Sequence, residues 1–191
     1  MDTRNSHGLD QFCSLLEERP GLAILDFAGA SQNTITFVTG QGHRLCSDDV
    51  LLQLDTCFGD ALENQSDPFK VEDFVHAAFD FPEESFDGAL IWDTLEFLTP
   101  QLLARVMNRL HAMLRPGAVL FAMFHAQEHK QPIPSYSYRI QDRKTILMTP
   151  RGNRTPASFF NNRNLEKLFQ DFQSVKFFLT RDALREVIVK R

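Results

Sequence analysis

Two periods of hydrophobic residues alternate along this chain. Short apolar runs, as found in strands that are buried on both faces, lie at 22–27, 43–47, 86–92 and 118–124. Segments with apolar residues three and four positions apart, which favour helices, lie at 9–18, 33–39, 49–58, 100–114 and 164–172. Strands that alternate with helices predict an α/β fold with a mostly parallel sheet and helices on both faces.

The stretch 71–78 is compatible with either element. Phe74 and Ala78 lie at helical distances from Val71, whereas Val71, Asp73 and the residues that follow also alternate as a strand would. One more strand of the sheet is expected here or directly after this stretch. Both alternatives stay open.

Two strands are predicted at the end of the chain, at 174–179 and 186–189. The connector 180–185 is too short for a parallel crossover, which needs about a dozen residues, so the two strands must run antiparallel. Together with the alternating elements before it, this pair predicts a Rossmann-like, seven-stranded, mostly parallel sheet with an antiparallel C-terminal strand.

Residues 126–156 are polar and interrupted by prolines, with a possible hairpin around Tyr138–Met148. A segment of this length and composition between two regular elements is typical of an insertion. We expect it to lie as a lid over a cleft in a single domain that covers residues 1–191.

Composition is that of an ordinary globular domain, because 191 residues with 43% hydrophobic content can form one core. The three cysteines, Cys13, Cys46 and Cys57, form no C-x-x-C pair, which argues against a zinc site or a disulfide framework. The polar start lacks a signal-peptide pattern, and no apolar run approaches the roughly 20 residues that span a bilayer. We therefore expect a cytoplasmic protein without a membrane partner.

Charge is distributed unevenly. The first 100 residues contain 19 acidic and 4 basic side chains, and residues 101–191 contain 6 and 16. Basic residues concentrate between Lys130 and Arg163, beside Tyr136 and Tyr138. This combination can bind nucleic acid, but we favour two complementary charged faces of one packed domain.

The middle of the chain resembles the class I S-adenosylmethionine-dependent methyltransferases. Residues 85–87 read Ser-Phe-Asp and residues 114–117 read Leu-Arg-Pro-Gly, at the spacing of that family. Ala118 replaces the second glycine of the latter motif, and Phe97 replaces the histidine of the family's Leu-x-His-Leu segment. The resemblance runs from about residue 22 to the end of the chain, and it implies S-adenosylmethionine as cofactor.

In this family, a turn with three glycines after the first strand lets the backbone approach the methionine part of the cofactor. The corresponding turn here follows Asp26. In one register the glycine positions fall on Ala28, Ala30 and Gln32; shifted by one residue, they fall on Gly29, Ser31 and Asn33. The resemblance thus makes Asp26 and residues 28–31 candidate cofactor ligands.

Two further cofactor ligands are implied. Asp48, at the end of the second strand, matches the acidic residue that binds the ribose hydroxyls. It could equally cap the helix 49–58, and Asp49 could exchange roles with it. Trp92, the only tryptophan, lies where the cofactor pocket is walled, although a core position is an alternative.

Candidate catalytic residues are Asp93, which follows the fourth strand, and His125, which follows the fifth. Either side chain could deprotonate a substrate; the alternatives are a solvated carboxylate or cap and a structural histidine. Methyl transfer needs little beyond alignment and desolvation. The function expected from the resemblance is therefore a methyltransferase acting on a small molecule, and the alternative is a methyltransferase-like scaffold with lost or weak cofactor binding that serves as an interaction or regulatory module.

We predict that the basic segment from Lys130 to Arg163 does not bind nucleic acid specifically, because the acidic half of the chain repels phosphate backbones and no reading motif is present. A gel-shift assay with defined RNA and DNA should show no sub-micromolar, salt-sensitive complex. Such a complex would overturn the prediction.

Overall fold

The computed structural model describes residues 2–59, 61–128, 131–180 and 184–191. Six strands form the main sheet, in the order β3 (Arg44–Ser47), β2 (Ala23–Asp26), β4 (Phe86–Trp92), β5 (Leu114–His125), β9 (Leu184–Lys190) and β8 (Ser174–Leu179). The first four are mutually parallel, and β9 is antiparallel to both of its neighbours. The predicted antiparallel pair at the end of the chain is confirmed.

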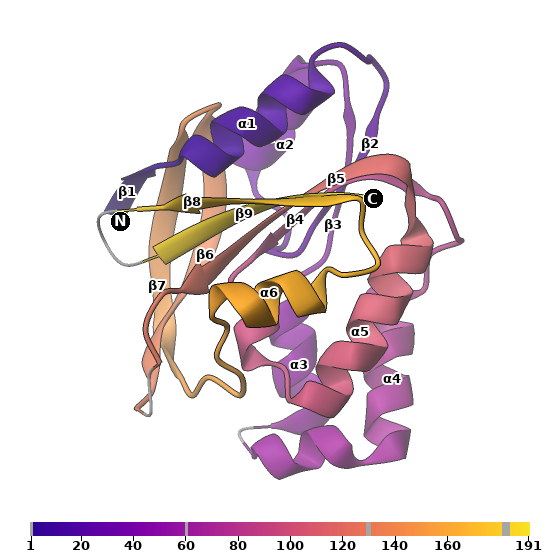
Figure 1. Ribbon diagram of the computed structural model, residues 1–191, viewed down its shortest axis with the longest axis vertical. Coiled ribbons are helices and arrows are strands. Elements are labelled where there is room, and N and C mark those ends of the chain that lie inside the picture. Colours follow the sequence, from indigo (N-terminus) through magenta and orange to yellow (C-terminus); the bar gives the residue numbers. More distant parts are fainter. Residues whose placement is uncertain (1, 60, 129–130, 181–183) are drawn as a thin grey trace.

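Helices cover both faces of this sheet, as the alternating pattern predicts. They are α1 (His7–Leu16), α2 (Gln32–Gly40), α3 (Val50–Phe58), α4 (Pro68–Phe79), α5 (Pro100–Met113) and α6 (Asn162–Leu168), with short 3-10 turns η1 (Leu62–Ser66) and η2 (Thr94–Phe97). In Figure 1, α1 and α2 lie above the strands and α5 and α6 below them. Among the described residues, no helix has the length and apolar character needed to cross a membrane.

The ambiguous stretch 71–78 is helical. Asp67 caps the start of α4 by accepting hydrogen bonds from the backbone amides of Phe69 and Lys70, and Pro68 occupies the first turn. The apolar residues at helical spacing, including Phe74, are buried. The main sheet therefore has six strands within the described ranges, and the predicted seventh strand is not confirmed.

Close packing holds α1 on the sheet. A Cβ atom on Gly8 would lie 2.7 Å from the ring of Phe121 on β5 and 2.9 Å from Cβ of Glu186 on β9. The backbone amide of Gly8 donates to the buried Glu186 carboxylate at 2.7 Å, and Arg4 pairs with the same carboxylate. The helix can approach this closely because residue 8 has no side chain.

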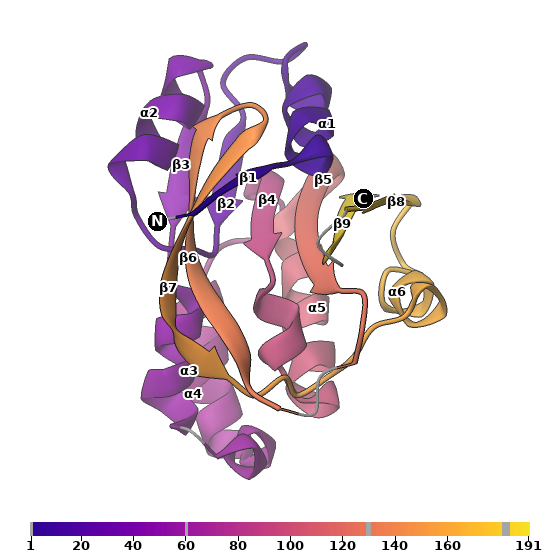
Figure 2. The same ribbon diagram turned by 90° about the vertical axis from the view of Figure 1, so that its left-hand side faces the viewer.

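A second, smaller sheet contains β6 (Ile133–Asp142) and β7 (Thr145–Arg154), with β1 (Asp2–Asn5) paired to β7. The predicted hairpin is thus present, with longer strands than the sequence indicates. The pattern did not predict β1, because its four residues are polar and do not alternate. Figure 2 shows the hairpin running across the molecule from α2 toward α3, in front of the ends of the main strands.

Replacing Gly8 with alanine should lower the free energy of unfolding by about 1–3 kcal/mol, because the new methyl group overlaps Phe121 and Glu186. Urea denaturation measures the change. Gly40→Ala is the matched control, since a Cβ there meets nothing within 4 Å. Equal stability of the two variants would show that α1 does not depend on this close approach.

Candidate functional site

Polar side chains gather where the parallel strands end. In open α/β sheets, ligands bind in the crevice outside the carboxyl ends of the strands. The structure brings Asp26 of β2, Trp92 of β4 and the following Asp93 together at this edge. Tyr138 of the hairpin completes the group.

Asp26 is fully buried and bound from two sides. Its Oδ1 accepts hydrogen bonds from the indole nitrogen of Trp92 at 2.7 Å and from the amide of Ala28 at 3.0 Å. Its Oδ2 has no hydrogen-bond partner among the described residues. Burial raises the pKa of Asp26 to about 6, although both hydrogen bonds favour the ionised form.

Trp92 has an unusual backbone. Its φ of 58° lies in the left-handed region, which is costly for a bulky residue, and the pairing of β4 with β5 shifts register between Leu90 and Trp92. The indole is 1% exposed and stacks on Tyr138, with ring centroids 5.0 Å apart and planes 6° apart. This conformation turns the indole across the strand ends toward Asp26.

Asp93 forms a polar contact with the hairpin. The hydroxyl of Tyr138 donates to Asp93 Oδ2 at 2.7 Å, and Asp93 Oδ1 has no partner within the described ranges. Burial raises the pKa of Asp93 to about 6, and burial together with the Asp93 charge raises the pKa of Tyr138 well above its usual value. The position of Tyr138 was not predicted, since nothing in the local sequence indicates a contact 45 residues away.

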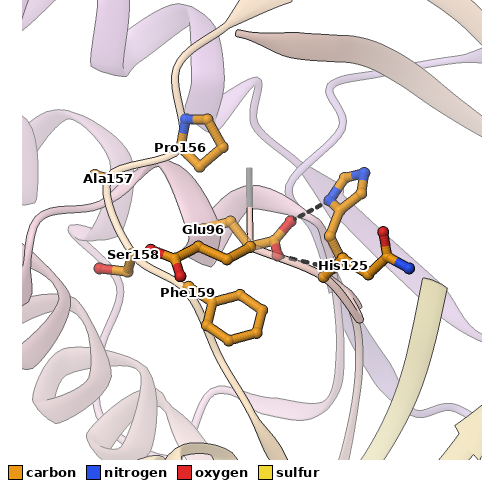
Figure 3. A pocket seen from close by; sticks show the side chains of 8 residues that line it. Glu96, His125, Pro156, Ala157, Ser158 and Phe159 are labelled. Carbon is orange, nitrogen blue, oxygen red and sulfur yellow. Dashed lines mark hydrogen bonds and ion pairs between the residues drawn. The ribbon is translucent and has the colours of Figure 1, made fainter. Parts of the chain in front are cut away.

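His125 pairs with Glu96 of η2 beside a small cavity of about 110 Å³. The two carboxylate oxygens of Glu96 contact the backbone amide and Nδ1 of His125, both at 2.7 Å (Figure 3). Burial opposes a charge on His125, but the hydrogen bond and charge of Glu96 outweigh it and raise the pKa of the imidazole. A histidine held in this way can act as a base near neutral pH.

The turn after β2 agrees with the second alignment of the glycine positions, the one that begins at Gly29. Its positive φ, 80°, falls on Gly29, whereas Ala28 and Ala30 keep ordinary backbone angles. The backbone of Gly29 lies close to the loop that follows β3. Its amide donates to the carbonyl of Asp48, and an added Cβ would lie 3.1 Å from Asp49. Ser31 caps α2 by accepting a hydrogen bond from the Thr34 amide.

Asp48 and Asp49 have different contacts in the structure, and Asp49 is the helix cap. Asp49 caps α3 through the Leu52 amide and forms an ion pair with Arg151 of the hairpin at 2.8 Å. Asp48 remains half-buried at the end of β3, and burial raises its pKa. Gln32, which could have entered the methionine site, is exposed and bonds to Thr36.

No protein-family model matches the sequence, and no curated protein does. Solved structures do match. The 1,6-didemethyltoxoflavin-N1-methyltransferase of Burkholderia thailandensis, with bound 1,6-didemethyltoxoflavin and S-adenosylhomocysteine, is 14% identical over 97% of this chain and 78% of its own, with a TM-score of 0.53. A S-adenosylmethionine-dependent methyltransferase of Aquifex aeolicus is 13% identical over 96% and 90%, with a TM-score of 0.52. The chain has the class I methyltransferase fold.

In this methyltransferase fold, the predicted cofactor ligands fall into two groups. Asp26, Ser31 and Trp92 are engaged within the protein, by the contacts described above. Ala28, Gly29, Ala30 and Asp48 are partly or fully exposed. With Tyr138 stacked on Trp92 at 3% exposure, a bound S-adenosylmethionine could contact this face of the indole only if the hairpin moved. Their assignment as cofactor ligands therefore stays a prediction, as does the catalytic role of Asp93 and His125.

The buried Asp93 predicts a pH-dependent stability. Its pKa rises from 3.8 to about 6 on folding, so its contribution to stability is complete below pH 3.8 and is lost as the pH rises through 6. Asp93→Asn should remove this loss. The free energy of unfolding of Asp93→Asn should therefore exceed that of the wild type. This excess should be larger at about pH 8 than at about pH 5, by about 1 kcal/mol.

Urea denaturation at the two pH values measures the difference. The exposed Asp73→Asn is the matched control and should show no such pH dependence. A gain that is the same at both pH values would mean that Asp93 is not held in a desolvated site.

Proposed function

We propose that this chain is a methyltransferase-like binding or regulatory module in which cofactor binding is weak or lost. The observation that carries the proposal is the stack of Tyr138 on Trp92, which covers the indole at the carboxyl ends of the neighbouring strands β2 and β4. A ligand at this edge of the sheet must compete with the protein's own hairpin.

The competition lowers affinity by mass action. If the hairpin is closed most of the time, the apparent dissociation constant rises by the inverse of the open fraction. Each 1.4 kcal/mol that favours closure weakens binding about tenfold. Closure is supported by the Tyr138 hydroxyl on Asp93, and by ion pairs from Arg151 to Asp49 and from Arg154 to Asp55.

An active S-adenosylmethionine-dependent methyltransferase acting on a small molecule is the second candidate. It is favoured by the half-buried Asp48 at the ribose position, by the positive φ of Gly29 in the turn and by the His125–Glu96 pair. In that case, S-adenosylmethionine supplies the methyl group. His125 would accept a proton from the substrate, with Glu96 fixing the orientation of the imidazole.

A small molecule suits both candidates better than a nucleic acid as partner. Two arginines of the basic segment form ion pairs with carboxylates of the same chain, Arg143 with Asp10 and Arg151 with Asp49. Side chains engaged in this way lose part of their capacity to bind phosphates.

Calorimetric titration with S-adenosylhomocysteine tests the proposal. The wild type should bind weakly or not at all at about millimolar ligand, because the hairpin fills the crevice. Tyr138→Phe keeps the ring but removes the hydroxyl bond to Asp93 that supports closure, so it should bind S-adenosylhomocysteine about tenfold more tightly than the wild type.

Asp48→Ala is the variant that separates the two candidates. Tight binding by the wild type that disappears in Asp48→Ala would contradict the module and support the enzyme. Tyr136→Phe, on the same strand as Tyr138, controls for nonspecific effects of a lost hydroxyl.

A further inference from the structure

We infer that Tyr138 occupies an aromatic-ligand subsite, and that a planar aromatic molecule with a hydroxyl donor takes its place when the outer arm of the hairpin lifts. The outer arm is defined as residues 133–138 of β6 and 148–154 of β7. The inference deepens the proposed module by naming its ligand class. It requires no S-adenosylmethionine, so it stands whether or not that cofactor binds.

The subsite has a fixed flat wall. The indole of Trp92 is held by its hydrogen bond to Asp26 and by an edge contact with Phe121, at 5.7 Å between centroids and 89° between planes. One face of the indole is covered by Tyr138. Parallel stacking at about 5 Å suits any planar ring of similar size.

Acceptors surround this wall. Asp93 Oδ2 accepts the Tyr138 hydroxyl, whereas Asp93 Oδ1 and Asp26 Oδ2 have no donor among the described residues. Both side chains are at most 1% exposed. Buried carboxylate oxygens without donors are uncommon and costly. Tyr138 thus satisfies the subsite only in part, and an incoming hydroxyl finds acceptors already in position.

The backbone of Trp92 is strained at this subsite. Trp92 adopts a φ of 58° at a register shift of β4, which costs free energy and aims the indole into the crevice. Irregular pairing of this kind is frequent beside binding sites, where it redirects a side chain.

The outer arm is attached loosely enough to move. Of its apolar side chains, only Ile133 and Tyr138 are buried, and most of 148–154 is exposed or half-exposed. Its ion pairs, Arg151 with Asp49 and Arg154 with Asp55, are partly exposed, and pairs of this kind contribute about 0–1 kcal/mol each. The inner part of the hairpin is anchored separately by the buried Ile140 and Ile146.

The charge of the site selects the ligand. Asp26 and Asp93 are both acidic, so the site rejects anions and favours neutral or cationic donors. A phenol reproduces the ring and the hydroxyl that Tyr138 presents. The inferred ligand class is therefore a neutral or cationic phenol.

The probe is p-cresol, which is the side chain of tyrosine, and the reporter is the fluorescence of Trp92, the only tryptophan. Titration of the wild-type chain with millimolar p-cresol should change the emission in a saturable way. The ether 4-methylanisole has the same ring without the donor and should bind at least tenfold more weakly. Tyr138→Phe lacks the bond to Asp93, so its arm is easier to displace, and p-cresol should bind it about tenfold more tightly than the wild type.

Tyr136→Phe is the matched control, because this neighbouring tyrosine is half-buried and makes no hydrogen bond to Asp93. Its response should equal that of the wild type. The inference is overturned if p-cresol leaves Trp92 unchanged in both the wild type and Tyr138→Phe, or if the ether and the phenol act equally. Tyr138→Ala, with an emptied site, shows that the fluorescence detects a bound ring.

Discussion

The indole of Trp92 contacts three segments that are far apart in sequence. Its nitrogen binds Asp26 at the end of β2, its ring makes a T-shaped contact with Phe121 of β5, and its face stacks on Tyr138 of the hairpin. The backbone accepts a left-handed conformation at Trp92 to allow this. The position of the hairpin, the burial of two carboxyls and the state of the crevice all depend on this side chain.

Opposite charge explains how the rest of the hairpin is held. The acidic first half of the chain supplies Asp10, Asp49 and Asp55, and the basic second half supplies the arginines that bind them. Acidic side chains of the first half therefore pair with basic side chains of the second half. These pairs favour the interpretation of two complementary charged faces rather than a surface that binds an anionic partner. Such pairs are weak singly and sensitive to salt. They orient the hairpin more than they stabilise it.

Local signals predicted most of the fold. Apolar residues at helical spacing predicted the helices within 49–58 and 100–114, because that spacing places them on one buried face. The helix at 71–78 was harder to predict, since Val71 fits both periods. At the site, Asp26, Trp92, Asp93 and His125 could be placed at strand ends from the order of elements. Their partner Tyr138 could not, because which side chain of an insertion enters a crevice is decided by tertiary packing.

The pairing of β1 with β7 has a consequence for synthesis of the protein. Asp2 lies opposite Met148, and β9, at the very end of the chain, is the strand between β5 and β8. Residues 2–5 thus pair only after residues near 148 have been synthesised, and the edge of β5 that binds β9 stays unpaired until residues 184–190 have been synthesised. Contacts of such long sequence separation slow folding. During that interval, the exposed edge of β5 is a surface to which chaperones or other nascent chains can bind.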